Sequence, residues 1–184
     1  MQSITLVWMT IECVVSLFAA ARAHSVALLA FGSDSLIELL SAVVVLLQFS
    51  PRFPLKQKPA ERCAAVLLFL LAAVVVAMAL WNRRSPVAAS PFGIAITALA
   101  LIAMPVLASL KRREARRLGS AVLAADAMQS ATCAYLAAVT LAGLAINAVW
   151  CLAWIDAVAA LAAVPVLVVE GRRTWRGEGC GCGH

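Results

Sequence analysis

The sequence predicts an all-α, polytopic membrane protein with six transmembrane helices and with its N- and C-termini in the cytoplasm. Of its 184 residues, 64% are hydrophobic and only 13% are charged, and the mean hydropathy is +0.97. Soluble domains are about 45–50% apolar and about 25% charged, and a water-soluble chain of this size could not bury so much apolar surface. This composition excludes soluble enzymes, DNA-binding proteins and disordered chains.

Six apolar stretches are long enough to span a bilayer, since a helix needs roughly 20 residues to cross a hydrocarbon core about 30 Å thick. Only residues 22–24 separate the first stretch from the second. The fifth and sixth come from one long apolar run, in which Asn147, Trp150, Trp154 and Asp156 indicate a turn at the membrane interface. Asp156 is expected to cap the sixth helix. The predicted spans are 4–21, 25–49, 61–81, 91–110, 118–147 and 153–170.

The distribution of Lys and Arg predicts the orientation. Twelve of these residues lie in loops 50–62 and 111–117 and in the tail, against three on the opposite side. Because cytoplasmic loops carry an excess of Lys and Arg, both termini and these loops are expected in the cytoplasm, with the chain in the inner membrane. Residues 1–170 form the predicted transmembrane domain, and residues 171–184 form a short cytoplasmic tail.

Four acidic residues interrupt the predicted spans: Glu12, Asp34, Glu38 and Asp126. An ionisable side chain within a span costs about 2.5–3.5 kcal/mol on insertion scales and indicates function. No Lys or Arg is expected at their depth, so protons, a bound cation or a water-filled cavity must neutralise them. Asp34 and Glu38 lie one turn apart on one helix face, which favours a divalent-cation site over a protonated pair. Glu12 is a candidate proton site, or else a protonated group bonded to a neighbour.

The fifth stretch carries a polar stripe of Asp126, Gln129, Ser130 and Cys133, which share one helix face. Such residues can serve only as contacts between helices, and a buried Cys often behaves as a small hydrophobic residue. Two stripes that each offer two ligands one turn apart could, however, build a four-coordinate metal site. The sequence therefore predicts a metal site between the second and fifth helices.

Two runs of residues carry a resemblance to a known family. Ser25-Val26-Ala27-Leu28-Leu29, followed by Asp34-Ser35-Leu36-Ile37-Glu38, resembles the second helix of the cation diffusion facilitator family. Ala125-Asp126-Ala127-Met128-Gln129 resembles that family's fifth helix. The resemblance implies that a homodimer exports divalent transition metals, usually zinc, in exchange for protons. It places the metal ligands on Asp34, Glu38, Gln129 and Cys133, with Asp126 as a nearby helper.

The sequence departs from this family in three respects. The family's usual site histidine, one candidate proton carrier, is absent, and His24 is expected near a membrane interface instead. Gln129 and Cys133 stand where the family usually has an Asp or His pair, and Gln is a poor ligand for transition metals. Either Asp126 replaces Gln129, or the site has a different selectivity. The family's cytoplasmic metal-binding domain is also missing, so the chain is similar to a transmembrane-only cation transporter.

Ligand chemistry gives a preference for the metal. Carboxylates alone suit Mn²⁺ or Mg²⁺, whereas a thiolate shifts the preference toward Zn²⁺ and Cd²⁺. Zinc is expected first, followed by cadmium, iron and manganese. In the tail, Cys180, Cys182 and His184 offer two thiolates and an imidazole, which form either a cytoplasmic capture arm for soft metals or an incidental Gly-rich end.

The predicted function is therefore efflux of a divalent metal cation by proton antiport with alternating access. The alternative is a membrane sensor or accessory subunit that binds a metal without moving it. No nucleophile–base set typical of an enzyme is recognisable, and no cofactor is expected beyond the transported ion. The expected partners are metal ions, protons, the lipid bilayer and a second copy of the chain, and no nucleic acid.

Overall fold

The computed structural model describes residues 2–48, 57–81, 87–88, 90–119, 121–150 and 152–176. Within these ranges, the side chains at 2–5, 41–48, 57–61, 118, 121–126 and 153 lie outside the description. The described residues form six α-helices and no strand, which confirms the all-α prediction. The helices are α1 (Gln2–Ala23), α2 (Val26–Gln48), α3 (Gln57–Trp81), α4 (Pro91–Leu118), α5 (Ala121–Trp150) and α6 (Ala153–Trp175).

Five of these helices, α1, α3, α4, α5 and α6, are long and apolar enough to cross a membrane. The chain therefore has the architecture of a helical membrane protein. The side chains of α2 are described only as far as Leu40, so the sixth span stays a prediction. Several helices extend beyond their predicted spans, and α4 and α6 extend furthest: α4 continues to Leu118, so residues 111–117 are helical rather than a loop, and α6 continues to Trp175.

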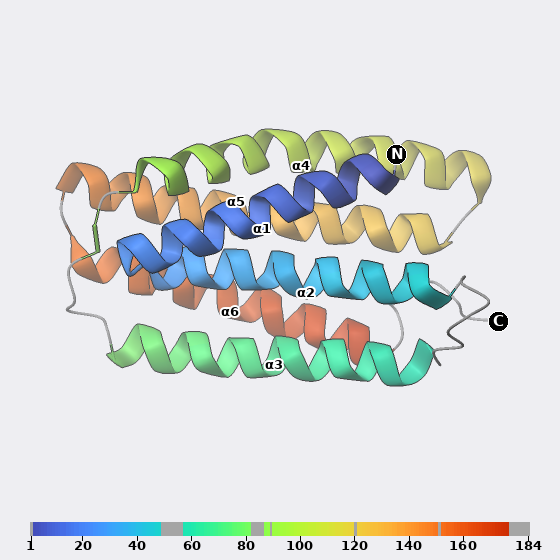
Figure 1. Cartoon of the computed structure of the whole chain (residues 1–184), viewed down its shortest axis with the longest axis horizontal. Coiled ribbons are helices and arrows are strands. Elements are labelled where there is room, and N and C mark those ends of the chain that lie inside the picture. The colour runs from blue at the N-terminus through green and yellow to red at the C-terminus, as the bar shows by residue number, and fades with distance from the viewer. Residues whose placement is uncertain are drawn as a thin grey trace.

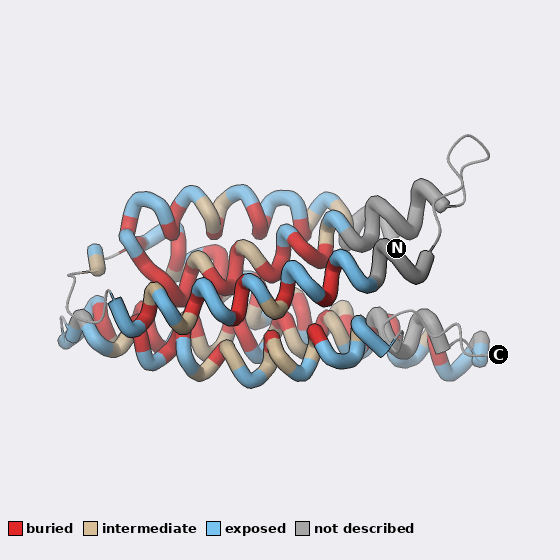
Figure 2. Tube along the Cα trace, turned by 90° about the horizontal axis from the view of Figure 1, so that it is seen from below, coloured by how far each residue is buried: buried red, intermediate tan, exposed pale blue. Residues whose placement is uncertain are grey.

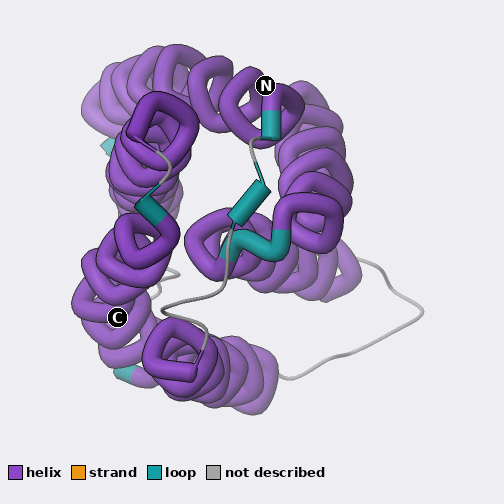
Figure 3. The backbone as a smooth tube through the Cα atoms, turned by 90° about the vertical axis from the view of Figure 1, so that its left-hand side faces the viewer, coloured by secondary structure: helices purple, strands orange, loops and turns teal. Residues whose placement is uncertain are grey.

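The helices lie side by side and alternate in direction, so that α1 begins and α6 ends at the same end of the bundle (Figure 1). That end carries Arg62 of α3 and the basic last turns of α4 and α6, and we call it the basic end. A view along the bundle shows only helices and short loops among the described residues (Figure 3). Helix α2 packs against α1, α3, α5 and α6, which places its side chains among those of four neighbours.

Buried residues recur along the inward sides of the helices, and exposed residues lie on the outside (Figure 2). Large apolar side chains such as Phe92, Ile102 and Val149 are exposed on the outer surface, as lipid contact requires. The interior holds Leu28, Phe31 and other fully buried apolar residues, but it also holds carboxylates. Polar groups within this apolar bundle are the exceptions that call for an explanation.

The junction between α1 and α2 is tight, and Asp156 reaches it from another part of the chain. His24 ends α1 with a positive φ of 55°, and the Ser25 amide donates to the Ala20 carbonyl at 3.3 Å, a Schellman arrangement. Ser25 then begins α2, because its hydroxyl oxygen accepts a hydrogen bond from the Leu28 amide at 3.1 Å.

Asp156 caps α2 rather than α6, which corrects the sequence-based expectation. One carboxylate oxygen of Asp156 accepts from the Ser25 hydroxyl, and the other accepts from the Val26 amide at 2.7 Å and the Ala27 amide at 3.4 Å. The N-cap of α6 is Leu152, which makes no capping bond through its side chain. Asp156 therefore joins α6 to the start of α2, at the end of the bundle opposite the basic end.

Candidate metal centre

Three carboxylates from two helices meet inside the bundle. Asp34 and Glu38 of α2 and Glu170 of α6 each offer one ligand atom, and these atoms all lie within 4.8 Å of one another. The i, i+4 spacing places Asp34 and Glu38 on one face of α2, and the packing of α6 against α2 brings in the third carboxylate. Asp34 is 1% exposed and Glu38 is 5% exposed, so bulk water does not solvate their charges.

The oxygens of this cluster lack hydrogen-bond partners. Both oxygens of Asp34, Oε1 of Glu38 and Oε2 of Glu170 are buried and have no partner among the described residues. An unsatisfied buried polar group costs about 1–3 kcal/mol, and a charged one costs more. Two neighbouring carboxylates in a medium of low dielectric also repel one another. The cluster therefore needs protons or a bound cation to be stable.

Gln129 of α5 contacts this cluster by a hydrogen bond from its side chain to the Glu38 carboxylate. An amide N–H donates to a carboxylate oxygen, since an ionised carboxylate can only accept. The bond holds Glu38 in place while its Oε1 stays without a partner in the described part of the chain. In this arrangement Gln129 orients a carboxylate of the cluster.

Cys133 lies beside Glu12 of α1. Three donors from three helices converge on the Glu12 carboxylate. The Cys133 thiol donates to Oε1 at 3.3 Å, the Ser35 hydroxyl donates to the same oxygen at 2.9 Å, and the Trp8 indole donates to Oε2 at 2.8 Å. Cys133 and Glu12 are both 0% exposed. The Cys133 thiol therefore belongs to the group of hydrogen bonds around Glu12. This group lies next to the carboxylate cluster, because Ser35 follows Asp34 directly in α2.

The structure thus separates the residues that the sequence analysis grouped. Asp34 and Glu38 lie in the carboxylate cluster, Gln129 is bonded to it, and Cys133 is bonded to Glu12. Other expected ligands lie outside the described residues, namely the side chain of Asp126 and all of Cys180, Cys182 and His184.

Glu170 is the member of the cluster that the sequence analysis missed. The predicted sixth span ends at this residue, and the acidic residues singled out within the spans do not include it. In the structure α6 continues for more than a turn beyond it, to Trp175. The available signal was the apolar run 164–169, which leads directly into Glu170 with no turn residue between them. At the helical period, a residue at this position can face the interior of the bundle as readily as its surface.

One lysine is buried close to the polar stripe of α5, which makes the expectation of no Lys or Arg at that depth wrong. Lys111 of α4 is 8% exposed, and its ammonium donates to the Ser130 hydroxyl at 3.0 Å. Because α4 continues as a helix to Leu118, Lys111 faces the bundle instead of a loop. Ser130 therefore contacts α4, whereas its neighbour Gln129 contacts α2.

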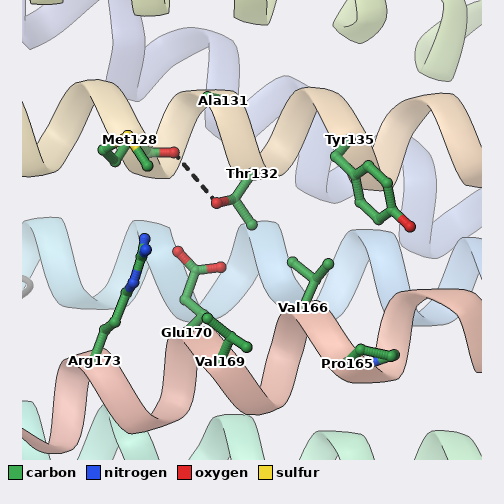
Figure 4. A pocket seen from close by; sticks show the side chains of 9 residues that line it. All are labelled: Met128, Ala131, Thr132, Tyr135, Pro165, Val166, Val169, Glu170 and Arg173. Carbon is green, nitrogen blue, oxygen red and sulfur yellow. Dashed lines mark hydrogen bonds between the residues drawn. The ribbon is translucent and has the colours of Figure 1, made fainter.

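A pocket of about 370 Å³ lies between α5 and α6 (Figure 4). Glu170 is one of its walls, so the pocket adjoins the carboxylate cluster. The lining residues are Met128, Ala131, Thr132, Tyr135, Pro165, Val166, Val169, Glu170 and Arg173.

No protein-family model matches the chain, and no curated protein matches it in sequence. The resemblance to the cation diffusion facilitator family therefore remains a prediction from the runs of residues quoted above. The chemistry of the site is independent of that resemblance. Two buried carboxylates and a half-buried one carry four oxygens without a hydrogen-bond partner among the described residues, and they form a donor set that suits a divalent cation.

Proposed function

We propose that the chain is a membrane transporter for divalent transition-metal cations, with zinc as the first candidate, and that Asp34, Glu38 and Glu170 hold the ion. The observation that supports this proposal is that four oxygens of the carboxylate cluster are buried and have no hydrogen-bond partner within the described ranges. A purely structural carboxylate finds donors in the protein, as Glu12 does with three of them. Asp34 and Glu170 make no such bond among the described residues.

The distances in the cluster are compatible with a small cation. Zinc binds carboxylate oxygens at about 2.0–2.2 Å, so two ligand oxygens of a tetrahedral site stand about 3.4 Å apart. The ligand atoms of Asp34, Glu38 and Glu170 lie within 4.8 Å of one another, and rotations of their side chains can close this difference. The Cys133 thiol is bonded to Glu12 and does not belong to the cluster, and an all-oxygen set by itself favours manganese. Zinc stays the first candidate on the family resemblance, and manganese is tested beside it.

Proton exchange follows from the same donor set. Metal ligands must be deprotonated to bind, so a proton and a metal ion compete for each carboxylate of the cluster. An inward proton that displaces the outgoing cation gives antiport, provided that the site opens alternately to each side of the membrane. We propose this exchange for a homodimer in the inner membrane.

Zinc flux in proteoliposomes tests the proposal. The purified full-length chain is reconstituted with an internal zinc dye and a pH dye, and the wild type is compared with Asp34→Asn, Glu38→Gln and Glu170→Gln. We expect zinc flux with opposite proton movement in the wild type and its loss in all three variants. Glu114→Gln is the matched control, because Glu114 lies on the surface of α4 and pairs with Arg117 at 3.3 Å; its flux should equal that of the wild type.

Two other results would contradict the proposal in different ways. Binding of zinc or manganese to the folded wild type without any flux would favour a metal sensor or accessory subunit. Flux that survives Glu170→Gln but not Asp34→Asn would remove Glu170 from the site. The second result would leave α2 as the principal source of ligands.

A further inference from the structure

Glu170 belongs both to the carboxylate cluster and to the wall of the pocket between α5 and α6. Its Oε2 atom is buried and has no partner among the described residues, whereas the residue as a whole is only half-buried. The same side chain therefore faces Asp34 and Glu38 on one side and the pocket on the other. A cation in the pocket would meet Glu170 before the two carboxylates of α2.

The remaining polar groups of the pocket suit a passing cation. Figure 4 shows Thr132 of α5 and Glu170 of α6 pointing toward one another. The Thr132 hydroxyl donates its proton to the Met128 carbonyl at 3.2 Å, so its oxygen faces the pocket as an acceptor. Apart from Arg173 and the phenol of Tyr135, the other lining residues present apolar side chains, which cannot retain an ion on the way.

Arg173 supplies a positive charge next to Glu170. It lies one turn further along α6, toward the basic end, and its guanidinium attracts the Glu170 carboxylate. Among the residues that line the pocket, Arg173 is the only one with a positive charge. An arriving cation can replace it as the counter-charge of Glu170, so that Arg173 acts as a positioning residue for this carboxylate.

The volume of the pocket admits a hydrated ion. A cation with six waters needs roughly 180 Å³ at about 30 Å³ per water, and the pocket offers about 370 Å³. The cluster itself is too tight for such a shell, since its ligand atoms lie within 4.8 Å of one another. The ion must therefore lose water between the pocket and the cluster, where Glu170 can substitute for it.

We infer that the pocket between α5 and α6 is the route by which the divalent cation reaches the metal centre, and that Glu170 transfers the ion from the pocket to Asp34 and Glu38. This inference rests on the proposed function. It adds an access path on the side of α5 and α6 and gives Thr132 a role as a ligand on that path.

Two valines of α6 provide a matched test. Val169 lines the pocket and is 51% exposed, whereas Val158 does not line it and is 49% exposed. Zn²⁺ is mixed rapidly with the purified full-length Val169→Trp and Val158→Trp proteins in lipid nanodiscs, and its association rate and equilibrium Kd are measured. We expect Val169→Trp to slow association at least about tenfold while its Kd stays within about threefold of wild type. Val158→Trp should match the wild type in both quantities.

A bulky group attached to the pocket after folding provides a second test, which holds even if Val169→Trp fails to fold. Val169→Cys and Val158→Cys proteins are purified and then treated with a bulky thiol reagent. Treated wild type is the control for the native cysteines, which include the exposed Cys63 and the tail residues Cys180 and Cys182. Only the modified Val169→Cys protein should bind Zn²⁺ slowly. Equal association rates for the two modified proteins would overturn the route while leaving the proposed function intact. Absence of Zn²⁺ binding to the wild type would instead overturn both.

Discussion

Replacing Asp156 by alanine removes the acceptor that joins the start of α2 to α6. Three donors lose their partner: the Ser25 hydroxyl, the Val26 amide at 2.7 Å and the Ala27 amide at 3.4 Å. Asp156 is 2% exposed, so water does not readily replace its oxygens. The expected result is a large loss of stability from a single residue that is far in sequence from the helix it caps.

The size of the stability loss in Asp156→Ala can be estimated from these contacts. The Val26 amide makes the short bond, and leaving a buried donor unsatisfied costs about 1–3 kcal/mol. The Ser25 hydroxyl can rotate and adds about 1 kcal/mol, the net value of a typical hydrogen bond, and the long bond from Ala27 adds little. We therefore expect Asp156→Ala to lower the free energy of unfolding by about 2–4 kcal/mol. Asp156→Asn keeps one acceptor oxygen and should lose about 1–2 kcal/mol.

Reversible unfolding in mixed detergent micelles, followed by circular dichroism, measures both values. Glu114→Ala is the control, because it breaks an exposed ion pair with Arg117 at 3.3 Å, which is worth about 0–1 kcal/mol. If Asp156→Ala lost no more stability than this control, the cap on α2 would contribute nothing to the free energy of unfolding. The assignment of Asp156 as the link between α2 and α6 would then be wrong.

Three further predictions concern helix packing, the hydrogen bonds around Glu12 and the pH dependence of zinc uptake. Gly143→Ala should destabilise the chain by about 1–3 kcal/mol, because the new Cβ would lie 2.6 Å from the Cβ of Ala159. Unfolding in micelles should show partial recovery in the double variant with Ala159→Gly, and no recovery would contradict the contact. Glu12→Gln should cost about 1–2 kcal/mol but keep the Kd for Zn²⁺ within about threefold; titration with Zn²⁺ would reveal a larger change if Glu12 were a ligand. Initial zinc uptake should fall as the pH on the uptake side is lowered, because protons compete with the metal for the carboxylates, and a rise would refute this competition.

The sequence alone determined the features that depend on local spacing. Its apolar runs predicted six helices, and the i, i+4 spacing of Asp34 and Glu38 placed two carboxylates on one face of α2. The start of α4 is equally local, because Ser90 caps it through the Gly93 amide and Pro91 follows as its first residue. Such patterns can be recognised in a single sequence because the helical period of 3.6 residues determines which neighbouring residues share a face.

Only the tertiary structure decided which distant residues meet. Glu170 is 132 residues beyond Glu38 in the chain and still shares its cluster, and Asp156 caps a helix that begins 130 residues earlier. Cys133 lies on the stripe that the sequence indicated, yet its thiol donates to Glu12. The rotation and contacts of each helix depend on how all the helices pack, since packing joins ridges and grooves from separate parts of the chain. A period of 3.6 residues defines the faces of a helix, but the rest of the bundle selects the partner that each face receives.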